Sequence, residues 1–131
     1  MSQENVEVVR PIYDALNRRD WDAVFSAVHA DFELPIHRLP QAGTYRGRDQ
    51  VQSLFEDYLT AFDNLVLEPE EFFEGGDQVV VFVKASAQIK GSSGDLENTH
   101  GHLWTIRDGT ILSLRMFPKR GEALEAAGLR E

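Results

Sequence analysis

Residues 102–117 read HLWTIRDGTILSLRMF, two alternating segments separated by an Asp-Gly pair. Polar and apolar side chains alternate with a period of two on both sides of the pair, which is typical of half-buried strands. An Asp-Gly linker between such segments favours a tight hairpin, because glycine adopts positive φ without strain. Extended back to Leu96, the pattern predicts an antiparallel hairpin with strands over 96–107 and 110–117.

Two earlier segments, 65–73 and 78–90, have the same period of two. Glycine-rich joints at 75–77 and 91–94 follow them, and their residues are turn formers. The second joint precedes a strand and not a helix, so it is a turn and not a phosphate-binding loop. The second half of the chain therefore predicts four strands connected in succession as antiparallel hairpins.

The first half of the chain follows the 3.6-residue period of amphipathic helices. Apolar positions from Val6 to Leu16 predict a first helix opened by Ser2, and Asp20 is a suitable N-cap for a short second helix. A third helix is predicted over 47–62, which has the widest apolar stripe.

Two short segments complete the expected fold. Residues 31–36 alternate as a strand that ends near Pro35. The tail KRGEALEAAGL, 119–129, contains helix formers and ends at Gly128, a C-terminal cap. Together the elements predict one α+β domain over 1–131.

The composition narrows the compartment and the partners. Thirteen Lys and Arg against 22 Asp and Glu give a formal charge of −9, which disfavours nucleic acid and anionic lipid as partners. There is no cysteine, and therefore no disulfide framework or thiol nucleophile. The acidic start MSQENVEVVRP does not match a signal peptide, and no stretch approaches the ~18 apolar residues of a membrane span. A cytoplasmic location is expected.

Two histidines stand out on the strand over 96–107. Alternation places Asn98, His100, His102, Trp104 and Ile106 on one face, which we assign to the interior. Buried imidazoles need hydrogen-bond partners, and histidine titrates near neutral pH, so the pair is a candidate proton donor and acceptor. The structural alternative, a core histidine satisfied by a neighbour, stays open.

A third candidate, His37, lies on a Pro/Gly-rich loop, where it either completes a cluster with His102 or is an exposed loop residue. The spacing of His100 and His102 is only a weak chelate signal, so no metal and no other cofactor is expected.

The remaining interior positions predict an apolar wall suited to a hydrophobic or aromatic ligand held by few polar groups. Plain core packing is the alternative for most of them. The expected lining residues are Trp104, Tyr58, Phe55, Phe62, Val81, Val83, Leu112, Leu114 and Met116.

Taken in the order of the predicted helices and strands, several segments resemble the SnoaL-like branch of the nuclear transport factor 2-like superfamily. They are VVRPIYDALNRRDWDAV at 8–24, YRGRD at 45–49, GGDQVVVFV at 75–83, HLWTIRDGTILSLRMF at 102–117 and GEALEAAGL at 121–129. The resemblance implies a cone, a strongly curved, mostly antiparallel sheet of the cystatin-like kind whose concave face is closed by three N-terminal helices. It also implies a small-molecule pocket at the wide end and a homodimer through the convex face.

Relatives in this superfamily include ketosteroid isomerases, polyketide cyclases and dehydratases. A loose alignment to the isomerases places their base near Ile36 or His37, their acidic hydrogen-bond donor near His102 and their tyrosine at Ile12, so Ile12 joins the expected pocket. Neither acid is present, and Tyr13, one place along, is expected to point elsewhere. This departure argues against steroid-isomerase chemistry.

Two functions follow from these observations. The leading one is a pocket protein that carries out an isomerisation, cyclisation or dehydration without a cofactor, with His102 as acid/base and His100 or His37 assisting. The alternative is a non-catalytic ligand-binding or dimerisation module whose histidines are structural.

Overall fold

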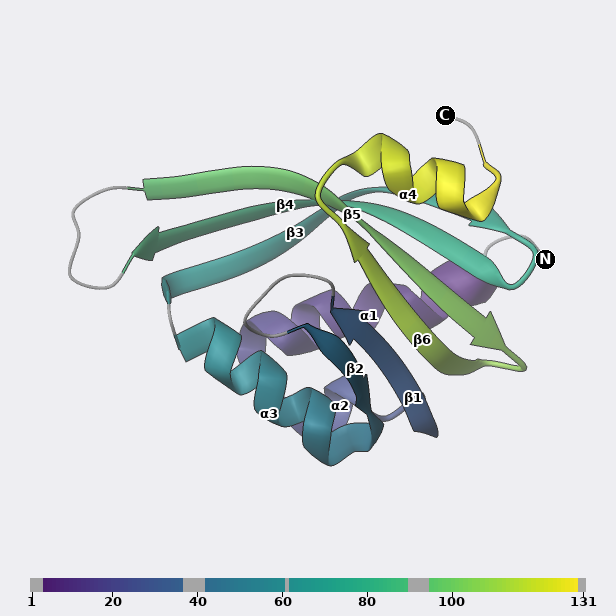
Figure 1. Ribbon diagram of the computed structural model, residues 1–131, viewed down its shortest axis with the longest axis horizontal. Coiled ribbons are helices and arrows are strands. Elements are labelled where there is room, and N and C mark those ends of the chain that lie inside the picture. The colour runs from purple at the N-terminus through teal and green to yellow at the C-terminus, as the bar shows by residue number, and fades with distance from the viewer. Residues whose placement is uncertain (1–3, 37–41, 61, 90–94, 130–131) are drawn as a thin grey trace.

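The computed structural model describes residues 4–36, 42–60, 62–89 and 95–129. These residues form four helices and six strands (Figure 1). In chain order they are α1 (Glu4–Arg18), α2 (Trp21–Val24), β1 (Val28–Ile36), β2 (Gly43–Arg46), α3 (Gly47–Thr60), β3 (Phe62–Gly75), β4 (Gln78–Ile89), β5 (Asp95–Arg107), β6 (Thr110–Phe117) and α4 (Arg120–Ala127). None of the described helices has the length and apolarity needed to cross a membrane.

The six strands form one curved sheet in the order β2-β1-β6-β5-β4-β3. Strands β3 to β6 pair antiparallel as successive hairpins, as the sequence predicts, and only the β1–β6 pair is parallel. The edge strand β2 is an addition to the prediction. It pairs with β1 through only four residues, too few to leave a periodic signal.

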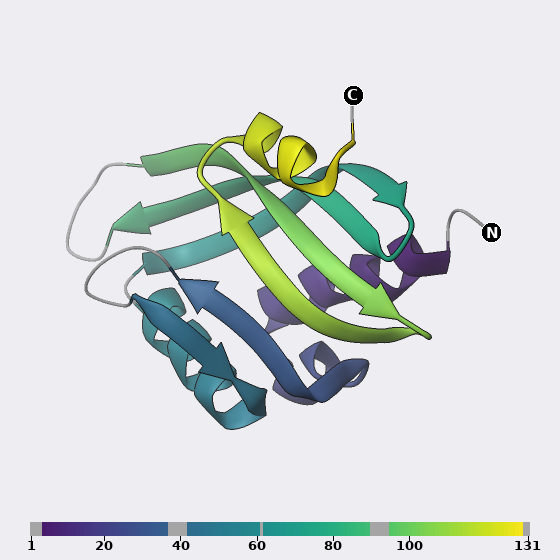
Figure 2. The ribbon, with the colours of Figure 1, turned by 45° about the vertical axis from the view of Figure 1, so that its right-hand side comes forward.

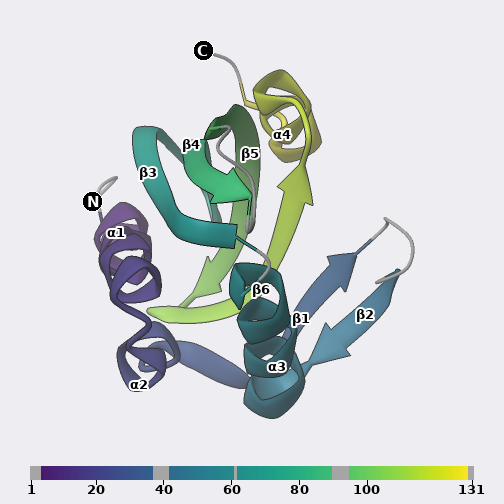
Figure 3. The ribbon, with the colours of Figure 1, turned by 90° about the vertical axis from the view of Figure 1, so that its left-hand side faces the viewer.

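The helices lie on both faces of the sheet. Helices α1, α2 and α3 close the concave face, as expected, and α4 crosses the opposite, convex face (Figures 1 and 3). The predicted C-cap is confirmed, because Gly128 has a left-handed backbone (φ 72°) and its N–H bonds back into the last turn. What the sequence did not predict is the place of this helix on the back of the sheet.

Strand β5 separates two cores because its side chains alternate between the faces. Trp104 and Ile106 belong to the main core under α1 and α3. Leu103 belongs to a smaller core that α4 covers with Ala123 and Leu124. The interior face predicted for β5 is therefore confirmed.

A bulge in β6 changes one predicted pocket residue. Ile106 pairs with Ile111 and Thr105 with Ser113, so Leu112 is the extra residue of the bulge. Ile111 and Leu114 consequently face the main core, and Leu112 does not join it. The prediction that Leu112 lines the interior was wrong, because strict alternation does not survive a bulge.

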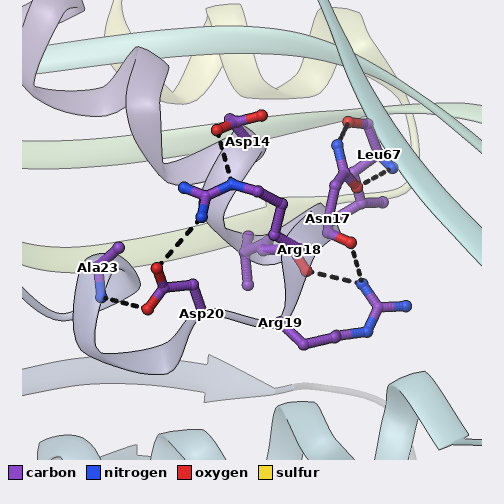
Figure 4. Close-up of polar contacts among 8 residues, drawn as sticks. Asp14, Asn17, Arg18, Arg19, Asp20, Ala23 and Leu67 are labelled. Atoms are coloured by element: carbon purple, nitrogen blue, oxygen red, sulfur yellow. Dashed lines mark hydrogen bonds and ion pairs between the residues drawn. The ribbon is translucent and has the colours of Figure 1, made fainter.

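The turn between α1 and α2 is attached to β3 by side-chain hydrogen bonds (Figure 4). The Asn17 amide donates to the Leu67 carbonyl at 2.9 Å and accepts from the Leu67 N–H at 2.8 Å. Arg19, at φ 60°, donates to the carbonyls of Leu16 at 2.6 Å and Leu65 at 3.3 Å. Asp20 caps α2 as predicted, accepting from the Ala23 N–H. These bonds set where α1 crosses the concave face.

Asn17→Ala should destabilise the fold by ~2 kcal/mol, because it leaves two half-buried backbone groups without partners. Asp14→Ala is the matched control on the same helix end, since it removes only an exposed ion pair to Arg18 and should change the stability much less. Urea unfolding of both variants gives the comparison. Equal effects would contradict the assigned role of Asn17.

The convex face differs from the expected dimer surface at one position. Alternation along β4 and β5 puts Lys84, Ser86, Gln88, Leu103, Thr105 and Arg107 on the convex face, but Leu103 is fully buried beneath α4. The strip beside Lys84 and Ser86 remains uncovered, and Val66, which pairs with Ser86, is 47% exposed there.

Pairing of two chains through this strip stays a prediction. Light scattering at micromolar protein should then give twice the 14.8 kDa chain mass. Val66→Glu should shift the mass toward the monomer, because a charge at the centre of the strip resists desolvation. A monomer mass for the unaltered protein would remove the prediction.

Candidate functional site

Four polar or aromatic side chains follow one another along the concave face of β5. Asn98 is exposed, His100 is half-buried, and His102 and Trp104 are 4% and 3% exposed. Spacing by two residues places all four on the same face. The row therefore leads from the end of the sheet into the main core.

Tyr13 of α1 joins this row into a continuous chain of hydrogen bonds. Trp104 Nε1 donates to Tyr13 Oη at 2.9 Å, and Tyr13 Oη lies 2.7 Å from His102 Nδ1. His102 Nε2 lies 2.9 Å from His100 Nε2, and His100 Nδ1 lies 3.2 Å from Asn98 Oδ1. We call these five residues the histidine chain.

Hydrogen-bond chemistry gives the histidine chain one direction. The Trp104 indole can only donate, and His102 Nδ1 is the one acceptor that the structure gives the Tyr13 hydroxyl among the described residues. His102 then carries its proton on Nε2 and donates to His100. His100 in turn carries its proton on Nδ1 and donates to Asn98. Every group is satisfied with both imidazoles neutral.

Burial keeps the inner part of the histidine chain uncharged. It lowers the pKa of His102 well below its usual value, and the neighbouring His100 ring adds to that shift. Burial also raises the pKa of the Tyr13 phenol, an effect that the hydrogen bond from Trp104 only partly offsets. A proton on His102 Nδ1 would, in addition, leave the Tyr13 hydroxyl without its acceptor.

These pKa directions decide what the histidine chain can do. Releasing a proton at the His100 end and refilling it from within would leave a phenolate at Tyr13, which burial opposes. The chain is therefore unsuited to delivering a full proton from the core. It is suited to presenting a fixed, neutral hydrogen-bond donor at its outer end, strengthened by the aligned bonds behind it.

Stability should fall as the pH drops below about 6.5, because the unfolded chain then protonates His102 and the folded chain does not. Well above about pH 6.5, His102 is neutral in both the folded and the unfolded protein, and its full contribution to stability is present. The slope from this one site approaches ~1.4 kcal/mol per pH unit until the lowered pKa of folded His102 is reached. Urea unfolding between about pH 5 and 7.5 measures it.

His102→Gln removes the titrating group and should flatten this pH dependence. His29→Gln, at an exposed histidine of β1, is the control and should keep the slope of the unaltered protein. Identical slopes in His102→Gln and the unaltered protein would contradict the neutral, buried state of His102.

The structure redistributes the predicted site residues. The pair His100 and His102 lies on the interior face, as expected. Both nitrogens of His102 bond to protein groups, which agrees with the alternative of a core histidine satisfied by its neighbours. His100 is the histidine nearer the exposed end. His37 lies outside the described residues.

Tyr13 is the residue that the sequence reasoning missed. The loose alignment put the tyrosine position of the isomerases at Ile12 and turned Tyr13 away, and the structure buries both, with Tyr13 at 1% exposure. The helical period contained the signal, because Tyr13 follows Val6 and Val9 on the same apolar stripe.

The predicted apolar wall is present, but it encloses little space among the described residues. Ile12, Phe55, Trp104 and Leu114 contribute to an apolar void of about 10 Å³, the space of a single water and too small for a ligand. Val83 is fully buried in the same core, and Met116 packs against it. The interior of the cone is thus packed instead of hollow.

Exposed apolar side chains lie at the outer end of the site. Leu96 is 41% exposed and, two residues before Asn98, lies on the same face of β5. It pairs with Ala87, which packs in one cluster with Phe62. Tyr58 contacts the Phe62 ring edge-on and is 50% exposed, so it borders the interior instead of lining it. We call Tyr58, Phe62, Ala87 and Leu96 the apolar rim.

Metal ligation finds little support in this arrangement. His100 and His102 direct nitrogens at each other, and the described residues contain no group of three or more His, Asp or Glu placed to hold an ion.

Comparison with known proteins identifies the fold class and the family of this chain. A helix-covered, curved α+β sheet is the nuclear transport factor 2-like class of fold. The SnoaL-like domain family matches residues 9–114, and the chain belongs to this family, which confirms the resemblance seen in the sequence. A search of curated proteins finds no match to the chain.

Three solved structures illustrate the likeness. A putative SnoaL-like polyketide cyclase from Jannaschia sp. CCS1 superposes with a TM-score of 0.80 at 20% identity, over 100% of this chain and 96% of that one. A nuclear transport factor 2-like protein of unknown function from Burkholderia pseudomallei gives 0.79 at 24%, over 95% and 97%. TerC, co-crystallised with polyporic acid, gives 0.77 at 25%, over 93% and 96%.

Proposed function

We propose that this SnoaL-like domain binds a mainly apolar or aromatic small molecule against the apolar rim and holds one of its oxygens with the N–H of His100. The observation that carries the proposal is the histidine chain, whose protons point from the core toward that rim. Placing polar side chains in a core costs free energy unless they are hydrogen-bonded. Packing alone is therefore a poor explanation for a row of them bonded in one direction.

The proposed chemistry is polarisation of a carbonyl or enol oxygen. Such an oxygen would accept from His100 Nδ1 in place of Asn98 Oδ1, or from the Asn98 amide beside it. Negative charge that develops on the oxygen is stabilised by a donor fixed in place before the reaction. A neutral imidazole serves this role without giving up its proton.

This chemistry fits an isomerisation, cyclisation or dehydration that passes through an enolate and needs no cofactor. His102 then acts through His100 and does not exchange protons with the substrate, a change from its expected role as acid/base. Two parts of this reaction stay predictions. One is the assisting role of His37, and the other is a base that removes a proton from the substrate.

The packed interior favours a second candidate function, ligand binding without turnover. With only about 10 Å³ of empty space in the main core, a ligand has no room there, and the rim is the place proposed for it. A rim-bound molecule is more open to water than one enclosed by the cone, and exclusion of water is what strengthens a donor such as His100. Turnover of a bound compound distinguishes the two candidates.

The ligand class is proposed from the rim and from one similar protein. Exposed aromatic and aliphatic side chains at the same end of the sheet as a hydrogen-bond donor suit a flat, oxygen-bearing aromatic compound. TerC, 25% identical over most of both chains, was co-crystallised with polyporic acid. Polyporic acid is therefore a reasonable first probe for this chain.

His100→Ala should weaken the binding of polyporic acid by about 5- to 10-fold, the value of one lost hydrogen bond to a polar ligand group. Isothermal titration calorimetry of the folded protein measures it. His29→Ala, an exposed histidine on β1, is the control and should bind as the unaltered protein does.

Leu96→Ser should also weaken binding, because it removes apolar contact from the rim without touching the histidine chain. Binding that is unchanged in both His100→Ala and Leu96→Ser would refute a site at this end of the sheet. Binding that depends on His100, with no conversion of the compound, would select the non-catalytic candidate.

A further inference from the structure

Helix α4 packs directly behind the two histidines. It crosses the convex face over β4, β5 and β6 (Figure 2), and its Ala123 is fully buried. The partners of α4 there include Phe82 of β4 and Leu103 of β5. The helix and the histidine chain thus occupy opposite faces of the same strand.

Gly101 lies between His100 and His102, and α4 approaches β5 closely at this residue. A Cβ at this position would lie 2.7 Å from Ala123 Cβ, 3.2 Å from Arg120 Cα and 3.3 Å from the Arg120 carbonyl oxygen. Two of these contacts are to helix backbone, which has no rotamer to change. Glycine inside a strand is typical of such close backbone approach.

Contacts away from Gly101 hold α4 in place. The Arg120 guanidinium lies over the Phe82 ring, 5.0 Å from its centroid, and pairs with Glu70. At the other end of the helix, Leu129 packs closely on Gly75. A side chain added at position 101 would therefore press on β5 as well as on the helix.

The geometry of the histidine pair is sensitive to such pressure. Residues two apart on a strand have Cα atoms roughly 6.6 Å apart. The two imidazoles nevertheless converge to 2.9 Å between their Nε2 atoms, with ring centroids 4.7 Å apart and planes tilted by 55°. Convergence of this kind depends on the course of β5 between the two histidines, and Gly101 is the residue between them.

We propose that Gly101 and Ala123 form a positioning contact that sets the distance and tilt between His100 and His102. The fit of α4 against the glycine holds β5 in the curvature that joins the two rings. The C-terminal helix is then part of the functional site without touching a ligand. The expectation that this contact influences ligand binding rests on the proposed function. The expectation that it sets the distance and tilt of the two imidazole rings does not.

The test compares Gly101→Ala with the double variant Gly101→Ala/Ala123→Gly. Long-range 1H–15N spectra report the tautomer and hydrogen bonding of each histidine ring, with or without a ligand. Gly101→Ala should shift the imidazole signals of His100 and His102 and weaken polyporic acid binding by about 2- to 10-fold, as expected for a misplaced hydrogen bond. The double variant removes the shortest of the three contacts, the one to the Ala123 methyl, and leaves the two to the Arg120 backbone. It should therefore restore both readouts part of the way to those of the unaltered protein.

Gly75→Ala is the matched control. Its added Cβ meets only the flexible end of Leu129, at the other end of α4, so it loosens the helix without pressing on β5. It should leave the imidazole signals unchanged. Equal imidazole shifts in Gly75→Ala and Gly101→Ala would overturn the proposal, since loosening of the helix alone would then explain them.

Unchanged imidazole signals in a folded Gly101→Ala protein would also overturn the proposal, even if its melting temperature fell. If Gly101→Ala does not fold, Ala123→Val applies pressure to the same contact from the helix side. The same imidazole shifts are expected in Ala123→Val, and their absence would overturn the proposal. If the unaltered protein does not bind polyporic acid, the spectra still test the positioning contact, so its failure is distinguishable from failure of the proposed function.

Discussion

The burial of His102 is the constraint on which the rest of the site depends. An imidazole at 4% exposure must have both nitrogens bonded, and the fold supplies Tyr13 from α1 on one side and His100 on the other. Because the Tyr13 hydroxyl oxygen also accepts a hydrogen bond from the Trp104 indole N–H, each bond fixes the direction of the next. Burial and hydrogen bonding thus produce a neutral donor directed toward the surface.

Distant parts of the chain hold this arrangement in place. The Asn17 and Arg19 contacts to β3 fix where α1 crosses the sheet, and so where Tyr13 meets His102. On the other face, α4 packs against the backbone of β5 at Gly101. The site thus consists of β5 with α1 on one face and α4 on the other, and the polar residues of β5 lie on the face toward α1.

The sequence predicts most of the fold and only part of the site. Period-two alternation correctly places His102 and Trp104 in the interior, because β5 has no bulge over these residues. The same rule fails at Leu112, where a bulge shifts the register. Tyr13 and the position of α4 depend on packing between segments some 90 and 20 residues apart, as the Tyr13–His102 and Gly101–Ala123 contacts illustrate. Local periodicity can indicate that Tyr13 is buried, but it does not identify His102 as its partner or the strand on which α4 packs.

The site depends on two histidines that are both neutral and share one direction of hydrogen bonding. Long-range 1H–15N spectra of the unaltered protein near pH 7 test it directly, because they identify which nitrogen of each ring carries the proton. We expect a proton on Nε2 of His102 and on Nδ1 of His100, with His102 staying neutral at acidic pH where an exposed histidine is mostly protonated. A proton on Nδ1 of His102, or a doubly protonated ring there at pH 7, would contradict it.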